Sequence, residues 1–200
     1  MRLSSFLIFF LFMSGANAQK FPFEFWHEGK VILESGDTVR GSIKYDLQSD
    51  ILQFDKNNKL ETYSARKVLA FEIFDKTVKR YRTFYSLPYS SNGAYKAPVF
   101  FELLSEGKIT LLAREAVELR SYPSSFYYYG TSSRMVLVNK FFILKDNGVI
   151  EVFNGKKNDL LAIMSTHGET IENYMKKNKL KLDDKYEFAS IVEYYNSLYK

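Results

Sequence analysis

The chain has 200 residues and no cysteine, with 46% hydrophobic residues, 26% charged residues and a formal net charge of +5. This composition is typical of a folded globular protein, and the missing cysteines exclude disulfides, thiol catalysis, thiolate metal sites, iron–sulfur clusters and the acylated cysteine of a bacterial lipoprotein. Because the basic residues are scattered, the positive charge gives little reason to expect a nucleic-acid partner, and we expect none.

The first eighteen residues predict a cleavable secretory signal peptide, 1–18. Arg2 is followed by the apolar run 6–13, and the small residues Ala16 and Ala18 precede the expected cut. The apolar run is too short to span a bilayer, which needs about 20 residues. We therefore expect a secreted or periplasmic mature chain without a transmembrane segment. A buried N-terminal helix is the alternative.

Residues 19–87 have the pattern of a β-rich, small-barrel-like region. Apolar and polar side chains alternate over 38–45, which is typical of a half-buried strand. Gly41 falls on the apolar side and predicts a bulge or sharp bend. Further strands are expected at 30–34, 51–54, 59–63, 68–74 and 78–85, with short turns between them, as in a small barrel or sandwich. In the last strand, Arg80 and Arg82 are expected on an ordinary exposed face.

Residues 87–98 predict a loop and an internal boundary, because they hold prolines, serines, Asn and Gly. The region 98–153 then predicts antiparallel hairpins. The strongest hairpin signal is Asp146-Asn147-Gly148, between strands expected at 135–144 and 149–153. The sequence leaves open whether the two strand-rich regions share one core.

Residues 154–200 change to a helical period. Apolar residues around Leu160 and Ile171 recur at helical spacing, and Asp183 is the expected N-cap of a last helix with Phe188 on its apolar face. An antiparallel β-rich body followed by a helical C-terminal segment predicts the α+β class. The oligomeric state stays open.

Residues 29–45 contain an apolar triplet, the turn Gly36-Asp37-Thr38 and a Gly-x-Ile strand beginning at Gly41. This pattern resembles the opening of a large group of uncharacterised secreted proteins from Bacteroidetes. The similarity extends through 63–68 and is echoed in 192–196. The resemblance implies an exported protein with a small β-barrel-like N-terminal segment, and it brings no catalytic residue with it.

The sequence contains none of the common catalytic or phosphate-binding motifs. His27 and His167 are its two histidines, whereas a typical zinc site needs three or four ligands and a nucleophile–His triad needs one histidine in a pocket. We therefore predict a packing or surface role for His27, a polar role in an interhelical turn for His167, and no catalytic residue, metal site or cofactor.

Carboxylates could still perform acid–base chemistry without histidine. Asp46, Asp50 and Asp55 surround one predicted turn, while Glu115 and Glu118 lie in a separate segment. A pair of such acids is the machinery of glycoside hydrolysis. A carboxylate-based hydrolase acting on an envelope polymer is therefore the alternative function, although solvated turn residues would give the same pattern.

The candidate ligand-binding residues are aromatic. Tyr122, Phe126, Tyr127, Tyr128 and Tyr129 gather in a segment with Pro, Ser and Gly that we expect to be a loop. Exposed rings supply a large contact area at low entropic cost, although the same rings could simply pack over the body. Together these observations predict a non-enzymatic binding or scaffold module for an envelope protein or glycan.

Overall fold

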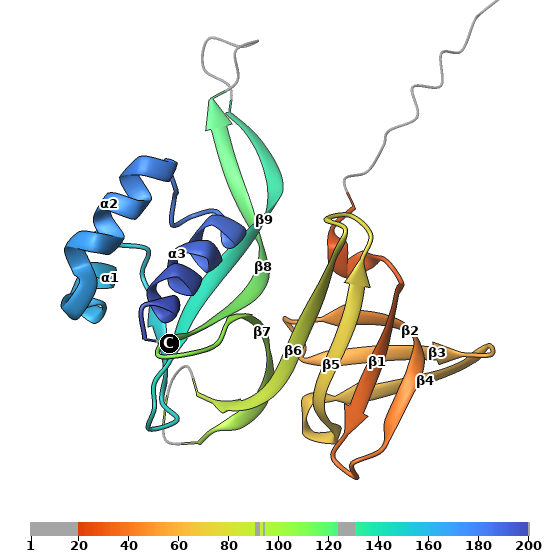
Figure 1. Cartoon of the computed structure of the whole chain (residues 1–200). Coiled ribbons are helices and arrows are strands. Elements are labelled where there is room, and N and C mark those ends of the chain that lie inside the picture. Colours follow the sequence, from red (N-terminus) through yellow and green to blue (C-terminus); the bar gives the residue numbers. More distant parts are fainter. Residues whose placement is uncertain (1–19, 91–92, 94, 124–130, 200) are drawn as a thin grey trace, which may run out of the picture.

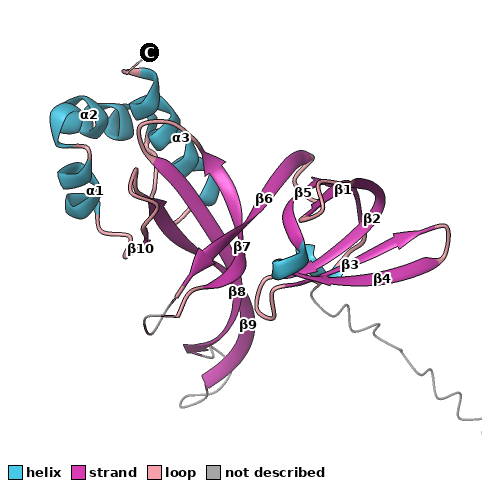
Figure 2. Cartoon of the chain, turned by 90° about the horizontal axis from the view of Figure 1, so that it is seen from below, coloured by secondary structure: helices cyan, strands magenta, loops and turns pink. Residues whose placement is uncertain are grey.

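The computed structural model describes residues 20–90, 93, 95–123 and 131–199, which form one antiparallel sheet of ten strands and three α-helices. The strands are β1 (His27–Leu33), β2 (Thr38–Asp46), β3 (Ile51–Lys56), β4 (Lys59–Ser64), β5 (Val68–Asp75), β6 (Arg80–Tyr89), β7 (Ala97–Ser105), β8 (Thr110–Pro123), β9 (Thr131–Leu144) and β10 (Ile150–Phe153). The helices are α1 (Lys157–Ile163), α2 (Gly168–Asn178) and α3 (Lys185–Ser197), with the short 3-10 helices η1 (Pro22–Glu24), η2 (Ala65–Lys67) and η3 (Ser165–His167). Figure 2 shows the helices gathered beside one part of the sheet, which confirms the α+β prediction.

The strand order in the sheet is β10-β9-β8-β7-β6-β5-β1-β2-β3-β4. The half from β1 to β6 curves into an open, barrel-like body, and β2, β3 and β4 cross the direction of β1 and β5 in Figure 1. Alternate residues of these strands face inward, as the period of two requires. The resulting core contains Val31, Ile43, Tyr45, Leu47, Leu52, Phe54, Ala65, Val68, Phe71, Ile73, Phe84 and Phe100.

Two glycines make the curvature of this half possible. Gly29 of β1 and Gly41 of β2 are directly opposite each other in the sheet. A Cβ atom on Gly41 would lie 2.5 Å from the carbonyl oxygen of Asp55, and one on Gly29 would collide with the carbonyl oxygen of Glu72. Glycine is therefore required where the curved strands bring neighbouring backbones together.

In the second half, α3 packs against β7 and β8, and α2 packs against α3 and α1 (Figure 1). Its core joins strand residues such as Leu111 and Ile143 to helix residues such as Leu160, Ile171 and Phe188. The N-cap of α3 is Asp184, one residue later than expected, because its Oδ1 accepts hydrogen bonds from the backbone N–H groups of Tyr186 and Glu187 at 2.9 and 3.0 Å. The Asp-Asn-Gly turn joins β9 to β10, which are paired antiparallel as predicted.

One continuous sheet connects the two halves. Strand β6 extends to Tyr89 and pairs there with Ala97 of β7, so the connection is shorter than the expected loop. The hydrophobic core is nevertheless divided, since Phe100 of β7 belongs to the barrel-like core while Leu111 of β8 packs under the helices. The two strand-rich regions therefore share a sheet but have separate main clusters.

The expected signal peptide, 1–18, lies outside the described residues. Within the part of the chain that the structure describes, no helix is both long and apolar enough to cross a membrane. Strands β8 and β9 pair along their whole length, from Thr110–Leu144 to Pro123–Thr131, and past the residues that pair with β7 and β10 they continue as a two-stranded ribbon (Figure 1).

Candidate functional site

The predicted aromatic site is only partly covered by the structure. Phe126, Tyr127, Tyr128 and Tyr129 lie outside the described residues. Tyr122 lies in strand β8 rather than in a loop, where it pairs with Ser132 of β9. Its half-buried ring is covered by Arg134, whose guanidinium carbon is 4.5 Å from the ring centre. Ligand binding by this aromatic group stays a prediction.

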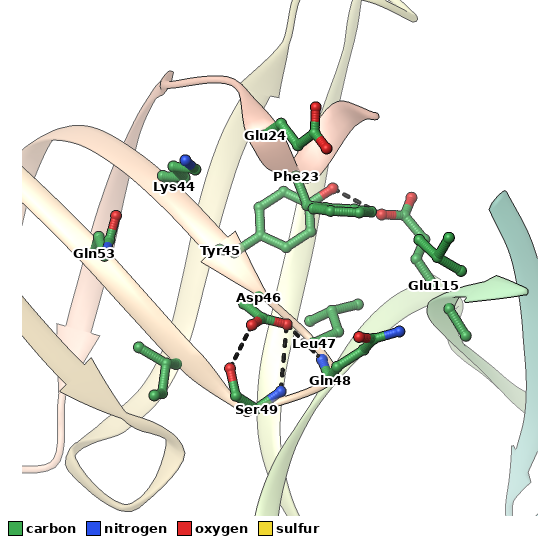
Figure 3. Close-up of a pocket in the computed structure, with 13 residues that line it drawn as sticks. Phe23, Glu24, Lys44, Tyr45, Asp46, Leu47, Gln48, Ser49, Gln53 and Glu115 are labelled. Carbon is green, nitrogen blue, oxygen red and sulfur yellow. Dashed lines mark hydrogen bonds between the residues drawn. The ribbon is translucent and has the colours of Figure 1, made fainter. Parts of the chain in front are cut away.

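A cleft of about 400 Å³ lies where the barrel-like half meets β8, and we call it the junction cleft (Figure 3). Residues of η1, of the β2–β3 hairpin and of β8 form its walls. They are Phe23, Glu24, Lys44, Tyr45, Asp46, Leu47, Gln48, Ser49, Ile51, Gln53, Glu115, Ala116 and Val117. Ligand sites favour such junctions, because two bodies supply groups from different directions.

The β2–β3 turn is held in shape by its own aspartates. The Asp46 carboxylate accepts hydrogen bonds from the Gln48 backbone N–H at 2.8 Å and from the Ser49 hydroxyl. Burial raises the pKa of Asp46, but these hydrogen bonds outweigh it and leave the pKa below its ordinary value. The Asp50 carboxylate accepts from the Phe100 N–H at 2.7 Å and pairs with Arg114 at 2.8 Å. The turn is thereby fixed to β7 and β8, which sets the position of the cleft wall.

The cleft offers one aromatic face and several free polar groups. The Phe23 ring is half-buried and stacks on Phe21, with ring centres 5.5 Å apart. The side chains of Lys44, Gln48 and Gln53 form no hydrogen bond or ion pair with any other described residue. Because their donors and acceptors are uncommitted, they are available to a polar ligand.

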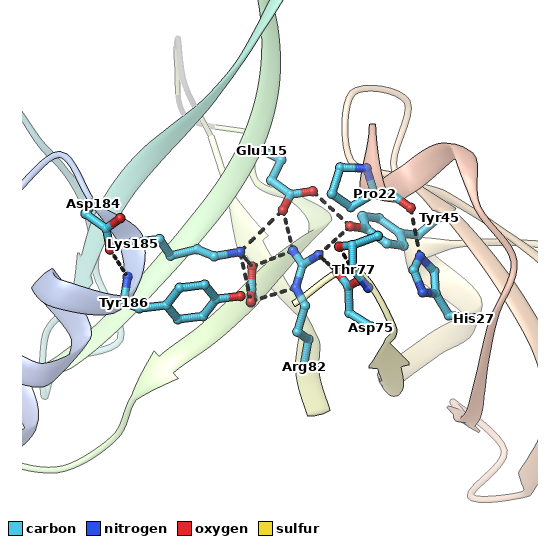
Figure 4. A network of polar contacts seen from close by, with 11 residues as sticks. Pro22, His27, Tyr45, Asp75, Thr77, Arg82, Glu115, Asp184, Lys185 and Tyr186 are labelled. Carbon is cyan, nitrogen blue, oxygen red and sulfur yellow. Dashed lines mark hydrogen bonds and ion pairs between the residues drawn. The ribbon is translucent and has the colours of Figure 1, made fainter. Parts of the chain in front are cut away.

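A buried ionic network lies beneath the cleft, and Arg82 is its centre (Figure 4). The Arg82 guanidinium donates to Glu102 at 2.7 and 2.9 Å, to Asp75 at 2.9 Å and to Glu115. It also donates to the hydroxyl of Tyr45 at 2.7 Å, and that hydroxyl donates to Glu115 at 2.9 Å. A planar guanidinium with five N–H groups suits this arrangement of several acceptors.

Lys185, at the start of α3, completes the network. Its ammonium group is 3.0 Å from a carboxylate oxygen of Glu102 and 3.4 Å from one of Glu115. The network therefore joins the barrel-like half, through Arg82, to the helical half. It fixes the relative position of the two bodies that form the junction cleft.

Glu102 of the network does not have the electrostatics of a general acid. Burial raises the pKa of Glu102, but the charges and hydrogen bonds of Arg82 and Lys185 outweigh burial and hold that pKa below its ordinary value. A general acid needs the opposite shift. Glu115 lines the cleft but is ion-paired with the same two cations. Burial also raises the pKa of Tyr45 well above its ordinary value, so its hydroxyl stays protonated and donates to Glu115.

The other titratable residues singled out by the sequence are dispersed. His27 is buried, with its Nε2 2.7 Å from the carbonyl oxygen of Pro22, and His167 lies in η3, where its ring packs against Tyr199. Glu118 is half-exposed in the β8–β9 ribbon. Among the described residues, no group of three or more His, Asp or Glu side chains could hold a metal ion.

The expectation that Arg82 lies on an exposed strand face is wrong, because its side chain is 2% exposed. The sequence contained a signal for this. Arg82 is two residues from Phe84, so both face inward if the alternation of β6 is followed strictly. No local signal points to Lys185, whose partner Glu102 is 83 residues away in the chain.

Comparisons with protein-family models, with curated proteins and with solved structures found no match for this chain. The resemblance to secreted Bacteroidetes proteins therefore stays a prediction. The candidate site is defined by its own geometry. It is a cleft at a junction, with an aromatic wall and free amide groups, and the buried ionic network lies beneath it.

Proposed function

We propose that this chain is an exported, non-enzymatic binding module that holds a cell-envelope glycan in the junction cleft. The observation that carries the proposal is the combination of one aromatic face with uncommitted polar side chains in a cleft whose buried acid is already ion-paired. Export is supported by the signal-like sequence 1–18, which begins with Arg2 and an apolar run.

Sugar rings suit this lining because they are amphipathic. One face of a sugar is apolar and can lie against an aromatic ring such as Phe23, while its hydroxyls need donors and acceptors at the edge. The amides of Gln48 and Gln53 provide both on planar groups. A hydrolase would instead need a protonated acid beside a second carboxylate. Glu115, the buried acid of the cleft, is instead ion-paired with Arg82 and Lys185, the same cations that pair with Glu102.

An envelope protein is the second candidate partner, and one observation favours it. Leu119 of β8 and Met135 of β9 are directly opposite each other, and they are 67% and 49% exposed. Two large apolar side chains side by side on a two-stranded ribbon form a small contact surface for another protein. Replacing both with Ser should remove such an interaction without changing glycan binding.

The glycan proposal can be tested with the mature chain. Trp26, the single tryptophan, is 44% exposed but does not line the cleft, so binding is measured by isothermal titration calorimetry and not by fluorescence. Soluble peptidoglycan fragments, β-glucan, mannan and dextran are the probes. Phe23→Leu and Gln53→Leu should each weaken binding about three- to tenfold, because each removes one contact to the sugar.

Tyr95→Leu is the matched control, since it removes a 72% exposed ring outside the cleft. It should bind like the unmodified chain. Equal binding by Phe23→Leu, Gln53→Leu and Tyr95→Leu would contradict the site, and no binding of any probe would contradict the proposed function. Far-UV circular dichroism of each variant shows whether its fold is retained.

A further inference from the structure

A second hollow lies on the outer face of the barrel-like half, opposite its hydrophobic core, and we call it the outer groove. It measures about 800 Å³ and crosses β1, β2, β3, β5 and β6. The lining residues that matter here are Arg40, Ser42, Asp55, Asn57, Phe74 and Tyr81. The fold and the ionic network do not use these side chains.

An aromatic platform forms one end of the outer groove. Tyr81 of β6 is 73% exposed, and its ring centre lies 5.1 Å from that of Phe74, its partner on β5. A large ring held by a neighbouring ring and open to solvent presents a flat apolar surface at little entropic cost. Such a surface is suited to stacking against the apolar face of a sugar.

The other end of the groove carries free hydrogen-bonding groups. Arg40, Ser42 and Asn57 form no side-chain hydrogen bond or ion pair with another residue in the described ranges, and Asp55 forms none although its Oδ1 is buried. Because donors and acceptors are both present, the groove can bond sugar hydroxyls that donate a hydrogen bond as well as those that accept one.

The outer groove adjoins the junction cleft along β2 and β3. Ser42 pairs with Asp55 in the groove, and Lys44 pairs with Gln53 in the cleft. These two cross-strand pairs are two residues apart on each strand, which is about 7 Å and places them on the same face of the sheet. A ligand held in the cleft can therefore continue directly into the groove.

The groove has no net charge. Three acids among its lining residues are matched by three basic residues, namely Glu28, Asp55 and Glu72 against Lys30, Arg40 and Lys56. The cleft adds Glu24 and Asp46 at its rim against Lys44. Because neither hollow has an excess of cations, an anionic polymer is disfavoured.

We infer that the two hollows together bind one extended, neutral polysaccharide chain, with Tyr81 stacking on a sugar remote from the cleft. The inference rests on the proposed function and adds the class of ligand. The groove from Asp55 to Tyr81 spans four interstrand spacings, at most about 19 Å, which is much longer than one sugar ring. Affinity should therefore rise with the length of the glycan.

The test compares each neutral probe polymer with its own disaccharide by isothermal titration calorimetry. The polymer should bind the unmodified chain about tenfold more tightly than the disaccharide, because a second ring stacks and more hydroxyls are bonded. Tyr81→Ala should remove most of this difference and leave disaccharide binding unchanged. Tyr81→Phe should keep the difference, since stacking needs the ring and not the hydroxyl.

Tyr85→Ala is the matched control, because Tyr85 is exposed on the same face of β6 but does not line the groove. It should keep the difference. Equal affinity for polymer and disaccharide in the unmodified chain, or an unchanged difference in Tyr81→Ala, would overturn the inference while leaving the cleft proposal in place. Tighter binding of polygalacturonate than of the neutral polymers would also overturn it. Binding of neither polymer nor disaccharide would overturn both proposals.

Discussion

Arg82→Met is expected to be the most destabilising single change in the ionic network. The substitution removes five hydrogen bonds, four to three carboxylates and one to the Tyr45 hydroxyl. Methionine fills part of the space but supplies no charge. Asp75, Glu102 and Glu115 are then left buried with Lys185 as the one cation of the network.

The expected loss of stability is about 3–5 kcal/mol, the range for removing one partner of a buried ion pair. A domain of ordinary size is stable by only about 5–15 kcal/mol, so the loss is a large fraction of the total. Burial raises the pKa values of Asp75 and Glu102, but Arg82 is among the groups that hold both below their ordinary values, so losing this cation raises them. The destabilisation should therefore be full at pH 8 and should decrease as the pH falls and these groups take up protons.

Urea unfolding followed by circular dichroism at pH 8 and pH 5 measures both effects. Arg120→Met is the control, because Arg120 is 52% exposed and its ion pair with Glu118 is 3.7 Å long. This control should change stability by less than about 0.5 kcal/mol. The reasoning is refuted if Arg82→Met costs less than about 1 kcal/mol at pH 8, the range of ordinary substitutions, or if its cost does not depend on pH.

Two further changes test the fold. Gly41→Ala should lower the free energy of unfolding, measured by urea titration, by about 1–3 kcal/mol, because its Cβ would be 2.5 Å from the Asp55 carbonyl oxygen. Gly93→Ala is the control and should be neutral, because the space around Gly93 is open. Burial raises the pKa of Glu102 but its cations lower it further, so its folded-state pKa lies below the ordinary value of 4.5. The stability that this ionisation contributes is present above pH 4.5 and is lost as the pH falls through the lower folded-state pKa. The unmodified chain should therefore lose free energy of unfolding in acid more steeply than Glu102→Gln. Equal dependence of the free energy of unfolding on pH in both chains would contradict the lowered pKa of Glu102.

Local patterns in the sequence predicted most of the strands and helices, although β6 and β8 extend into segments that were expected to be loops. The alternation in 38–45, the Asp-Asn-Gly turn at 146–148 and the helical spacing near Phe188 each depend on residues a few positions apart. Such patterns predict strands, hairpins and helices, and with them the α+β class. They also indicated that Gly41 has a special role, although the close approach to Asp55 is visible only in the folded chain.

The tertiary structure alone decided where the candidate site lies. The sequence predicts an ordinary exposed strand face for Arg82, but in the fold its side chain meets Glu102, Glu115 and Tyr45 from three other strands. Lys185 reaches the same point from a helix far along the chain. Local periodicity carries no information about such distant partners. The sequence by itself determined which segments form strands and helices, whereas the curvature and packing of the sheet decided which side chains share a cleft or a buried network.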